Sequence, residues 1–427
     1  MEPGGPARRT PVSEAVRIRS IAAGGDGVGT LGDGRTVFVS RTAPGDLAEV
    51  TVLTLAKRFA RARIERLVEP SPDRVVPPCQ HYDKDDCGGC QLQHLHADAQ
   101  RAARRRLVAD ALQRIGRLDA AEPPLEASDR EWEYRTKISL AVRGPLIGYH
   151  KVGRPDQIFD LRRCPIARPE INRLWTALRA NRRLLPRNTT QVVLRVDRDG
   201  GAHVILRVKG AEVWLGAREM GESLAKTGVT AVLWWQPEGG APRTVFGARE
   251  AYPAMVFEQV HPGMGDRVRE YAVASLGNIA GRHVWDLYAG IGETTLALAA
   301  AGATVESVEL DRRAVSLAET RGLVDGSVIR HAGRVEDVIP RLKAPDAILV
   351  NPPRAGLGDE VTGWLTTRFS NSQSPAPNTL IYVSCDPATL ARDIARLRTC
   401  YRVRDLRAFD LFPQTAHVET VARLEAL

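Results

Sequence analysis

The sequence predicts an α/β protein with a doubly wound, mostly parallel sheet in its C-terminal part and a small β-barrel near its N-terminus. One observation supports each of these two parts. From about Phe257 onward, strand-like and helix-like stretches alternate, which favours parallel strands joined by helices. Near the N-terminus, short alternating runs are interrupted by turn residues, as is typical of a small β-barrel of the OB type. The predicted strands of the C-terminal part are HVWDLYAG, TVESVEL, SVIRHAG, DAILVNPP and TLIYVSC.

These patterns divide the chain into four stretches. We expect a flexible tail over 1–12, the barrel over 13–70, a mostly β central region over 71–255 and the α/β domain over 256–427. The spacing predicts a helix over 97–116, for which packing on the α/β domain is one option, and one helical interruption of the later strands at WTALRANRRLL.

Composition and charge narrow the class of protein. Hydrophobic residues make up 43% and charged residues 26% of the 427 residues, which indicates a globular chain. A net charge of +9 suits a polyanionic partner, although a merely basic protein from an arginine-rich proteome is the alternative. The barrel contributes basic side chains that either follow a phosphate backbone or form a solvated edge: Lys57, Arg58, Arg61, Arg63 and Arg66.

Membrane insertion and secretion are not expected. No hydrophobic run approaches the ~18–20 residues that span a bilayer, and the N-terminus has no apolar secretory segment. Six cysteines, three of them within residues 79–90, do not resemble the disulfide framework of a small secreted domain. We therefore expect a protein of the reducing cytoplasm.

A glycine turn marks a candidate cofactor site. Gly290 and Gly292 follow one strand and precede a helix, where a backbone can approach a ligand closely. Glu309 ends the next strand and is placed to bind ribose hydroxyls. The pattern fits S-adenosylmethionine as well as NAD, and Thr295, at the position of a third glycine, favours S-adenosylmethionine.

The next two strands end in residues that carry chemistry. One ends in Asn351–Arg354, NPPR, where amino-methyltransferases have an aromatic residue in place of Arg354. This difference argues against methylation of an exocyclic amine. The other ends at Cys385, on the turn into a helix that begins near Pro387, and is the candidate for a nucleophile.

Methylation at C5 of uracil explains a cysteine at this position. C5 is too weakly nucleophilic to attack a methyl sulfonium, but thiolate addition at C6 creates an enolate that can. A separate base must then remove the C5 proton. We expect the helix N-terminus to lower the pKa of Cys385, and Glu419 to act as the base, with His417 on the same strand face as the alternative.

The chain resembles the RNA uracil-C5 methyltransferases, in the subgroup with an N-terminal TRAM domain and an iron–sulfur cluster. The motifs that carry this resemblance run through nearly the whole chain: WEYRTKISLAV, GYHK, RRCPI, FEQV, DLYAGIG, VNPPRAGL, YVSCDPATLARD and FPQTAHVE. The resemblance implies that Cys385 is the nucleophile and Glu419 the base. It also implies that S-adenosylmethionine is bound by Gln259, Tyr288, Glu309 and Asn351.

Four positions depart from the family pattern. His261 and Asp386 stand where asparagine is common, Asn351 replaces a frequent aspartate, and Glu293 stands where some relatives have asparagine. These differences affect individual contacts of the cofactor and the base rather than the class of reaction.

A cysteine cluster predicts a metal centre. Cys79, Cys87 and Cys90 are spaced C-x7-C-x2-C, and Cys164 is the next cysteine along the chain. Four thiolates hold either zinc or a 4Fe-4S iron–sulfur cluster, and spacing alone slightly favours zinc. The resemblance implies the 4Fe-4S cluster, in a structural or RNA-positioning role, with zinc as the alternative.

The central region interleaves aromatic and basic residues, which predicts an RNA surface. These residues are Tyr134, Arg135, Lys137, Tyr149, His150, Lys151 and Arg154. Trp234 and Trp235 are expected in the core, and Cys400 is expected to be structural.

The preferred function is methylation of a 23S ribosomal RNA uridine at C5 by a monomeric enzyme. Family members that act on transfer RNA in bacteria generally lack the barrel and the cluster, so transfer RNA is the second choice. A cytosine-C5 methyltransferase is less favoured, because Pro353 stands where those enzymes often have a further cysteine. A non-catalytic RNA-binding assembly factor is the remaining alternative.

Overall fold

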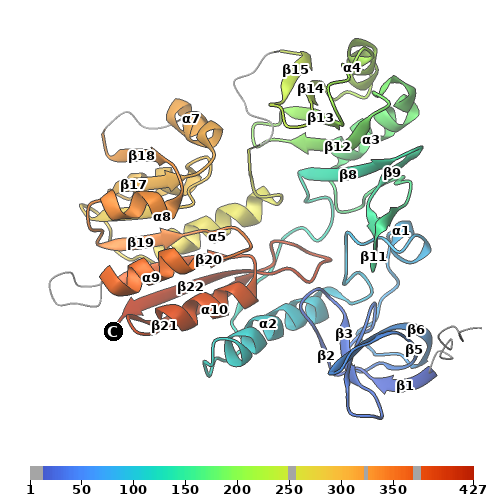
Figure 1. Cartoon of the computed structure of the whole chain (residues 1–427), viewed down its shortest axis with the longest axis horizontal. Helices are drawn as coiled ribbons and strands as arrows, with labels where there is room; N and C mark the ends of the chain where they lie inside the picture. The colour runs from blue at the N-terminus through green and yellow to red at the C-terminus, as the bar shows by residue number, and fades with distance from the viewer. Residues whose placement is uncertain (1–12, 249–255, 322–325, 369–376) are drawn as a thin grey trace, which may run out of the picture.

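The computed structural model describes residues 13–248, 256–321, 326–368 and 377–427, so the tail predicted over 1–12 lies outside them. Figure 1 shows the barrel and the central sheet on one side of the molecule and the C-terminal sheet on the other. Among the described helices, none combines the length and apolar character needed to cross a bilayer.

The N-terminal unit is a six-stranded sheet curled around its own apolar core. Its strand order is β1-β5-β6-β4-β3-β2, and β1 also contacts β3, so the sheet nearly closes on itself. The core is formed mainly by small aliphatic side chains such as Val16, Val37 and Val50. The strands are β1 Ser13–Arg17, β2 Ser20–Ile21, β3 Gly27–Thr30, β4 Thr36–Val39, β5 Leu47–Leu55 and β6 Phe59–Glu69.

The central region contains a six-stranded sheet of order β15-β14-β13-β12-β8-β9 with two helices packed on one face. Trp234 and Trp235 are both buried, as predicted. The strands are β8 Lys137–Arg143, β9 Leu146–Gly148, β12 Thr189–Val196, β13 Ala202–Val208, β14 Ala231–Gln236 and β15 Arg243–Phe246. The helices are α3 Pro169–Ala180 and α4 Ala217–Ala225, and a separate ribbon is formed by β10 His150–Lys151 and β11 Arg154–Ile158.

Helix α4 is not among the sequence predictions. Its nine residues include Gly221, which weakens the helical signal. The glycine has a packing reason, since a Cβ there would lie 2.2 Å from the ring of Phe246. The spacing of Ala217, Met220 and Leu224, all buried, is the signal that could have identified the helix.

The C-terminal sheet has eight strands in the order β18-β17-β16-β19-β20-β22-β21-β7. The first five are parallel, and β22 is antiparallel to both of its neighbours. These strands are β16 His283–Leu287, β17 Thr304–Glu309, β18 Val328–Ala332, β19 Ala347–Val350, β20 Thr379–Ser384, β21 Tyr401–Phe409 and β22 Glu419–Ala426.

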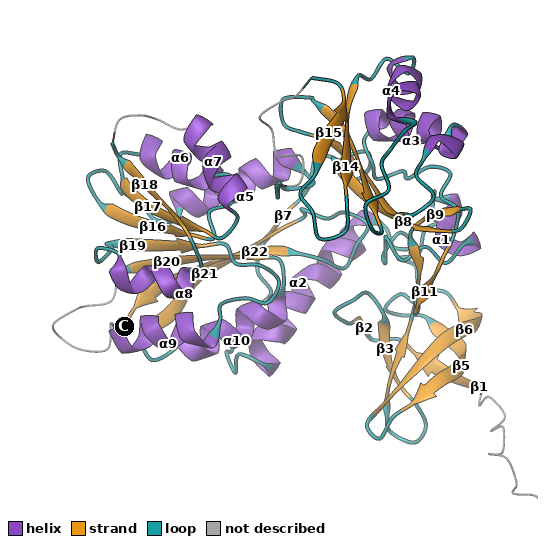
Figure 2. Ribbon diagram, turned by 45° about the horizontal axis from the view of Figure 1, so that its top comes forward, coloured by secondary structure: helices purple, strands orange, loops and turns teal. Residues whose placement is uncertain are grey.

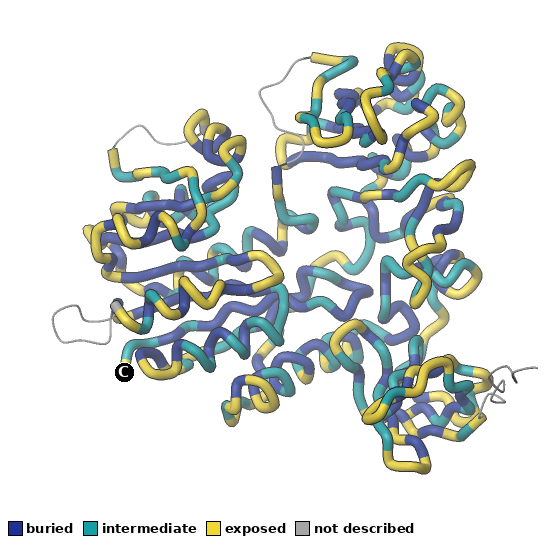
Figure 3. Tube along the Cα trace, in the orientation of Figure 1, coloured by how far each residue is buried: buried dark blue, intermediate teal, exposed yellow. Residues whose placement is uncertain are grey.

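Helices cover both faces of this sheet, so its central strands β16, β19 and β20 are buried throughout (Figures 2 and 3). One face carries α5 Pro262–Ala274, α6 Glu293–Ala300 and α7 Arg312–Arg321. The other carries α8 Val335–Val338, α9 Asp359–Arg368 and α10 Pro387–Leu397. This double covering explains why the strands read as continuous apolar runs.

Residues of the central region also extend the C-terminal sheet. Helix α2, Ala97–Arg114, packs against α10 through Val108 and Leu112. Strand β7, Leu125–Glu126, pairs with β21 at the edge of the sheet. A short helix, α1 Gln80–Lys84, precedes them within the cysteine segment.

Candidate functional site

A large cavity of about 1170 Å³ opens at the carboxyl ends of the parallel strands. This is where ligands collect in open α/β sheets, and the volume accommodates a cofactor together with a substrate base. The cavity brings together seven of the eight residues predicted for catalysis and cofactor binding: Gln259, Tyr288, Gly290, Glu309, Asn351, Cys385 and Glu419. Gly292 is the exception, because it does not line the cavity.

The glycine turn joins β16 to α6 and is tied to the end of β17. The N–H of Gly290 donates to Glu309 Oε2 over 2.9 Å, and the N–H of Asp311 donates to Oε1 over 2.8 Å. Gly292 is the N-cap of α6 with φ of 79°, and a Cβ there would lie 3.1 Å from Ala318. Gly292 is therefore required for the backbone conformation of the turn and does not form part of the cavity surface.

Asp286 is a buried carboxyl beneath this turn that the sequence reasoning missed. Thr295 Oγ1 donates to it over 2.6 Å. Burial raises the pKa of Asp286 to about 6, with Glu309 adding to the rise. Thr295, noted in the sequence only because it is not glycine, thus holds the strand end against the helix.

Cys385 and Glu419 are brought together by strand pairing. Strands β20 and β22 are antiparallel, with Ser384 opposite Thr420. Continued by one residue, this register sets Cys385 opposite Glu419, and both side chains line the cavity. Their separation in sequence is large, and their proximity follows from the antiparallel return of β22.

Glu419 is a buried carboxyl with no compensating hydrogen bond on Oε2 among the described groups. Burial raises the pKa of Glu419 to about 8, and nearby Arg354 partly opposes this rise. A carboxylate whose pKa lies near neutrality is suited to proton abstraction, because it exchanges its proton without a large driving force in either direction.

Burial raises the pKa of Cys385, which is opposite to the sequence prediction. Glu419 and Asp386 add to the rise, whereas Arg354 opposes it. The physical reason lies in the N-cap of α10. Asp386 Oδ1 accepts from the N–H groups of Ala388 and Thr389, over 2.9 and 3.1 Å. The helix N-terminus is therefore satisfied by an anion and does not lower the pKa of the thiol.

Replacing Asp386 with asparagine is expected to lower the pKa of Cys385. The substitution keeps an oxygen that can cap α10 and removes a negative charge beside the thiol. Alkylation of Cys385 by iodoacetamide at neutral pH should become faster, as measured by mass spectrometry across a pH series. Labelling of Cys400 in the same samples is the internal control, and an unchanged Cys385 profile would contradict this account.

Arg354 lines the cavity that also holds Cys385, and it contacts a histidine. Its Nη2 donates to His417 Nε2 over 3.3 Å. Burial, with Arg354 as the second cause, lowers the pKa of His417 to about 4, so the imidazole is neutral and accepts this hydrogen bond. The prediction that His417 shares a strand face with Glu419 is wrong, since β22 begins at Glu419 and His417 lines a different cavity.

Two positions that depart from the family pattern have structural partners. Glu293, the first residue of α6, forms ion pairs with Arg198 and Arg269 over 2.6 and 2.7 Å. His261 is the N-cap of α5 and its ring stacks on Tyr134, with 4.9 Å between ring centroids.

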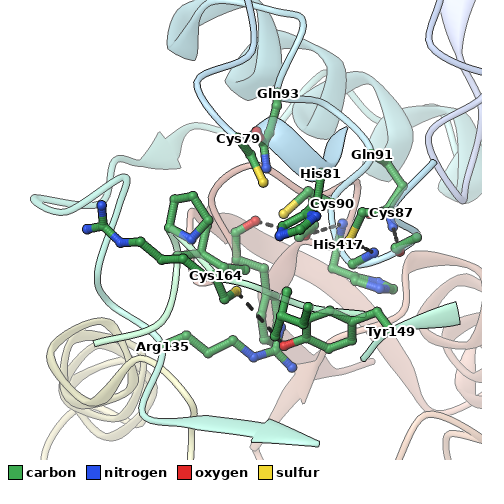
Figure 4. A pocket seen from close by; sticks show the side chains of 18 of the residues that line it. Cys79, His81, Cys87, Cys90, Gln91, Gln93, Arg135, Tyr149, Cys164 and His417 are labelled. Atoms are coloured by element: carbon green, nitrogen blue, oxygen red, sulfur yellow. Dashed lines mark hydrogen bonds between the residues drawn. The ribbon is translucent and has the colours of Figure 1, made fainter. Parts of the chain in front are cut away.

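The four cysteines predicted to hold a metal line a second cavity, of about 220 Å³ (Figure 4). All four are buried, and none forms a disulfide. Tyr149 Oη lies 3.9 Å from Cys164 Sγ, and the N–H of Gly89 donates to Cys87 Sγ over 3.4 Å. In the part of the chain that the structure describes, no group of three or more His, Cys, Asp or Glu residues is arranged to hold a metal ion. The metal centre therefore stays a prediction.

The proposed RNA surface is only partly exposed. Tyr134 is buried, and its hydroxyl donates to the carbonyl of Pro413, so its assignment to a surface is wrong. Tyr149 and Arg135 line the cysteine cavity. His150 and Arg154 of the β10–β11 ribbon are exposed, as are all five basic residues named on the barrel. Cys400 is buried, with Sγ 3.6 Å from the carbonyl oxygen of Thr366.

Comparison with protein families gives two matches. The family model described as tRNA (Uracil-5-)-methyltransferase matches residues 327–426, which include Asn351, Cys385 and Glu419. The TRAM domain model matches residues 15–64, within the curled N-terminal sheet.

Similar proteins extend this likeness over nearly the whole chain. The 23S rRNA (uracil(1939)-C(5))-methyltransferase RlmD of Aromatoleum aromaticum is 32% identical, over 96% of this chain and 98% of its own length. The protein of the same name from Dechloromonas aromatica is 31% identical over 93% of this chain and 96% of its own.

Among solved structures, the tRNA (uracil-54, C5)-methyltransferase of Pyrococcus abyssi, in complex with S-adenosyl-L-homocysteine, aligns with a TM-score of 0.69 at 22% identity. It covers 97% of this chain and 100% of its own. This likeness confirms the methyltransferase fold, and the TRAM match confirms the N-terminal unit. A metal cluster in the central region is not part of what these comparisons support.

Proposed function

This chain belongs to the RNA uracil-C5 methyltransferase family, and on that premise we propose that it transfers a methyl group from S-adenosylmethionine to C5 of a uridine in 23S ribosomal RNA. The observation that carries the proposal is the placement of Cys385 and Glu419 in one cavity with the strand-end carboxylate Glu309. A thiol nucleophile, a separate base and a cofactor site are the three parts that the reaction requires.

The residues around the glycine turn fit S-adenosylmethionine. Glu309 presents a carboxylate for ribose hydroxyls at the end of β17. The backbone at Gly290 leaves its surroundings open, since a Cβ added there would meet no atom within 4 Å. Tyr288, Gln259 and Asn351 line the remaining wall. When bound, S-adenosylmethionine supplies an electrophilic methyl group.

In the proposed reaction, Cys385 Sγ adds to C6 of the uracil after losing its proton. The resulting enolate places negative charge at C5, which would take the methyl group as the bond from that group to the sulfonium sulfur breaks and S-adenosylhomocysteine leaves. Glu419 then takes the C5 proton, the C5–C6 double bond re-forms and the thiolate leaves. Arg354 supports this sequence, since its positive charge favours the ionised form of both Cys385 and Glu419.

The uridine must leave its base stack to reach this cavity, at a cost of a few kcal/mol. The exposed basic residues of the barrel and of the β10–β11 ribbon are proposed to offset this cost through phosphate contacts. Ribosomal RNA is preferred as substrate because the two relatives above carry that activity in their names and match this chain end to end. Transfer RNA is the second candidate, favoured by the family description and by the archaeal structure.

We further propose that Cys79, Cys87, Cys90 and Cys164 hold a 4Fe-4S cluster in a structural role, with zinc as the alternative. Support comes from the donor set itself, four buried thiols around one cavity. We also propose a division of the chain into three parts: a barrel over 13–70, a central RNA-binding region over 71–255 and a catalytic domain over 256–427. A monomeric state and a cytoplasmic location are proposed as well.

Tritium release tests the proposed function. Unmodified 23S ribosomal RNA labelled at uridine C5 is incubated with the enzyme, with and without S-adenosylmethionine. We expect release that depends on the cofactor. Release from transfer RNA alone would transfer the proposal to the second substrate, and no release from either RNA by cofactor-binding enzyme would overturn it.

A further inference from the structure

The connection between β21 and β22, residues 410–418, is held by buried polar side chains of helix α2. Gln100 and Arg104 project from α2 and are 3% and 1% exposed, and Gln414 within the connection is 3% exposed. Buried polar groups of this kind stabilise a fold only when they are well paired. The hydrogen-bond partners of these side chains therefore show which segment of the chain they hold in place.

Gln100 and Gln414 form a reciprocal amide pair. Gln100 Oε1 accepts from the backbone N–H of Gln414 over 3.0 Å, and Gln100 Nε2 donates to Gln414 Oε1 over 2.9 Å. The carbonyl of Gln414 accepts from the N–H groups of Gln91 and Leu92, over 3.1 and 3.0 Å. Gln414 has φ of 70°, a left-handed conformation that glutamine rarely adopts without external support.

Neighbouring residues of the connection are held in the same way. Arg104 donates to the carbonyl of Thr415 over 2.8 Å and forms an ion pair with Asp410 over 2.9 Å. Tyr134 donates to the carbonyl of Pro413 over 3.0 Å. All of these partners lie about 280 to 310 residues away along the chain. The N-terminal half of the protein therefore holds the connection in place. We call the contacts made by Gln100, Arg104 and Tyr134 with residues 410–418 the clamp.

The connection held by the clamp directly precedes the proposed base, Glu419. Glu419 opens β22 and pairs with Phe409, the last residue of β21, so the connection closes directly on the Glu419 backbone. Since Glu419 Oε2 has no hydrogen-bond partner among the described groups, the position of this carboxylate depends on its backbone and its packing. Phe412, inside the connection, lines both the catalytic cavity and the cysteine cavity.

We propose that Gln100 is a positioning residue for proton abstraction, which acts by holding Gln414 and thereby the start of β22 and the carboxylate of Glu419. The proposal rests on the proposed function, because it assigns Glu419 the removal of the C5 proton. Loosening the clamp delays this last step more than it affects cofactor binding or attack by Cys385, which follows a different strand, β20. The methylated covalent RNA adduct then accumulates.

The test uses Gln100→Met, which keeps a similar volume and removes both hydrogen bonds to Gln414. We expect tritium release to fall by about 10- to 100-fold, as small displacements of catalytic groups do. The methylated adduct should become visible on denaturing gels, with unchanged affinity for S-adenosylmethionine. Gln100→Glu, which keeps the acceptor for the Gln414 N–H, should recover part of the activity. Arg106→Ala, on the solvent side of α2, is the matched control.

Hydrogen–deuterium exchange provides a readout that does not depend on turnover. Amides of residues 411–422 should exchange faster in Gln100→Met than in the wild type, and amides of β16 should not change. If Gln100→Met does not fold, the alternative variant is Gln414→Gly, because glycine adopts a positive φ readily and the change removes only the side-chain hydrogen bonds to Gln100 and to the Glu131 carbonyl. This variant is expected to show a smaller adduct signal.

The positioning role would be overturned if the folded variants released tritium at the wild-type rate and formed no adduct. Unchanged hydrogen–deuterium exchange over 411–422 would overturn it as well. An inactive wild-type enzyme with the expected exchange pattern would instead count against the proposed function, while the clamp itself would stand.

Discussion

Replacement of Cys385 by alanine is expected to reduce methyl transfer and C5 tritium release to background. Without a thiol in this cavity, no group can add to C6, and C5 stays too weakly nucleophilic to react. Removal of the nucleophile from a well-studied serine protease costs about 10⁶-fold in turnover, and a loss of that order is expected here. The measurement is tritium release from labelled RNA together with a search for the covalent adduct on denaturing gels.

Cys400→Ala is the matched control for this experiment. Both residues are free cysteines of the C-terminal sheet region, but Cys400 is buried away from the cavity. The Cys400 variant should retain turnover, and binding of S-adenosylmethionine should be preserved in both. Residual adduct in Cys385→Ala would show that another residue is the nucleophile.

Replacement of Glu419 by glutamine is expected to separate the two halves of the reaction. Cys385 can still add and C5 can still be methylated, but the C5 proton has no base to receive it. Tritium release should fall by about 10²- to 10⁴-fold, the usual contribution of a positioned base. RNA carrying the labelled methyl group should remain attached to the protein. Glu425→Gln, on the same strand, should release tritium at the wild-type rate and is the control.

The same substitution is expected to stabilise the fold at neutral and alkaline pH. The pKa of Glu419 rises from 4.5 to about 8 on folding, so the native protein retains a proton that the unfolded chain loses. Wild-type stability therefore decreases as pH rises from 4.5 through 8, whereas glutamine has no such dependence. Thermal unfolding should show a difference in Tm that is absent at acidic pH and grows towards pH 8. A constant difference would contradict the raised pKa.

Several features of the site were predictable because they follow from local sequence. The glycine turn, the acidic end of β17 and the cysteine at the end of β20 each lie on a strand end, and parallel strands bring their carboxyl ends to one edge. A strand–turn–helix pattern is sufficient to place Gly290, Glu309 and Cys385 together. Glu419 was identifiable as a carboxylate beside a mostly apolar stretch, although the same strand also carries Arg423 and Glu425.

Other features were not predictable because they depend on groups distant in sequence. The effect of the α10 N-terminus on Cys385 reverses once Asp386 occupies the cap, since a cap interaction depends on side-chain geometry. The helical spacing within α2 could not reveal that Gln100 and Arg104 face a loop about 310 residues later. Tyr134 belongs to an aromatic and basic pattern that suggests a surface, yet the returning connection covers it.

Periodicity and turn residues were enough to predict the alternation of strands and helices and the curled N-terminal sheet, and reaction chemistry was enough to propose Cys385 and Glu419 as nucleophile and base. Three properties required the folded chain: the protonation of Cys385, Glu419 and His417, the separation of the cysteine cavity from the catalytic cavity, and the clamp on residues 410–418. Burial and long-range hydrogen bonds set these properties, and both arise only when distant segments pack against one another.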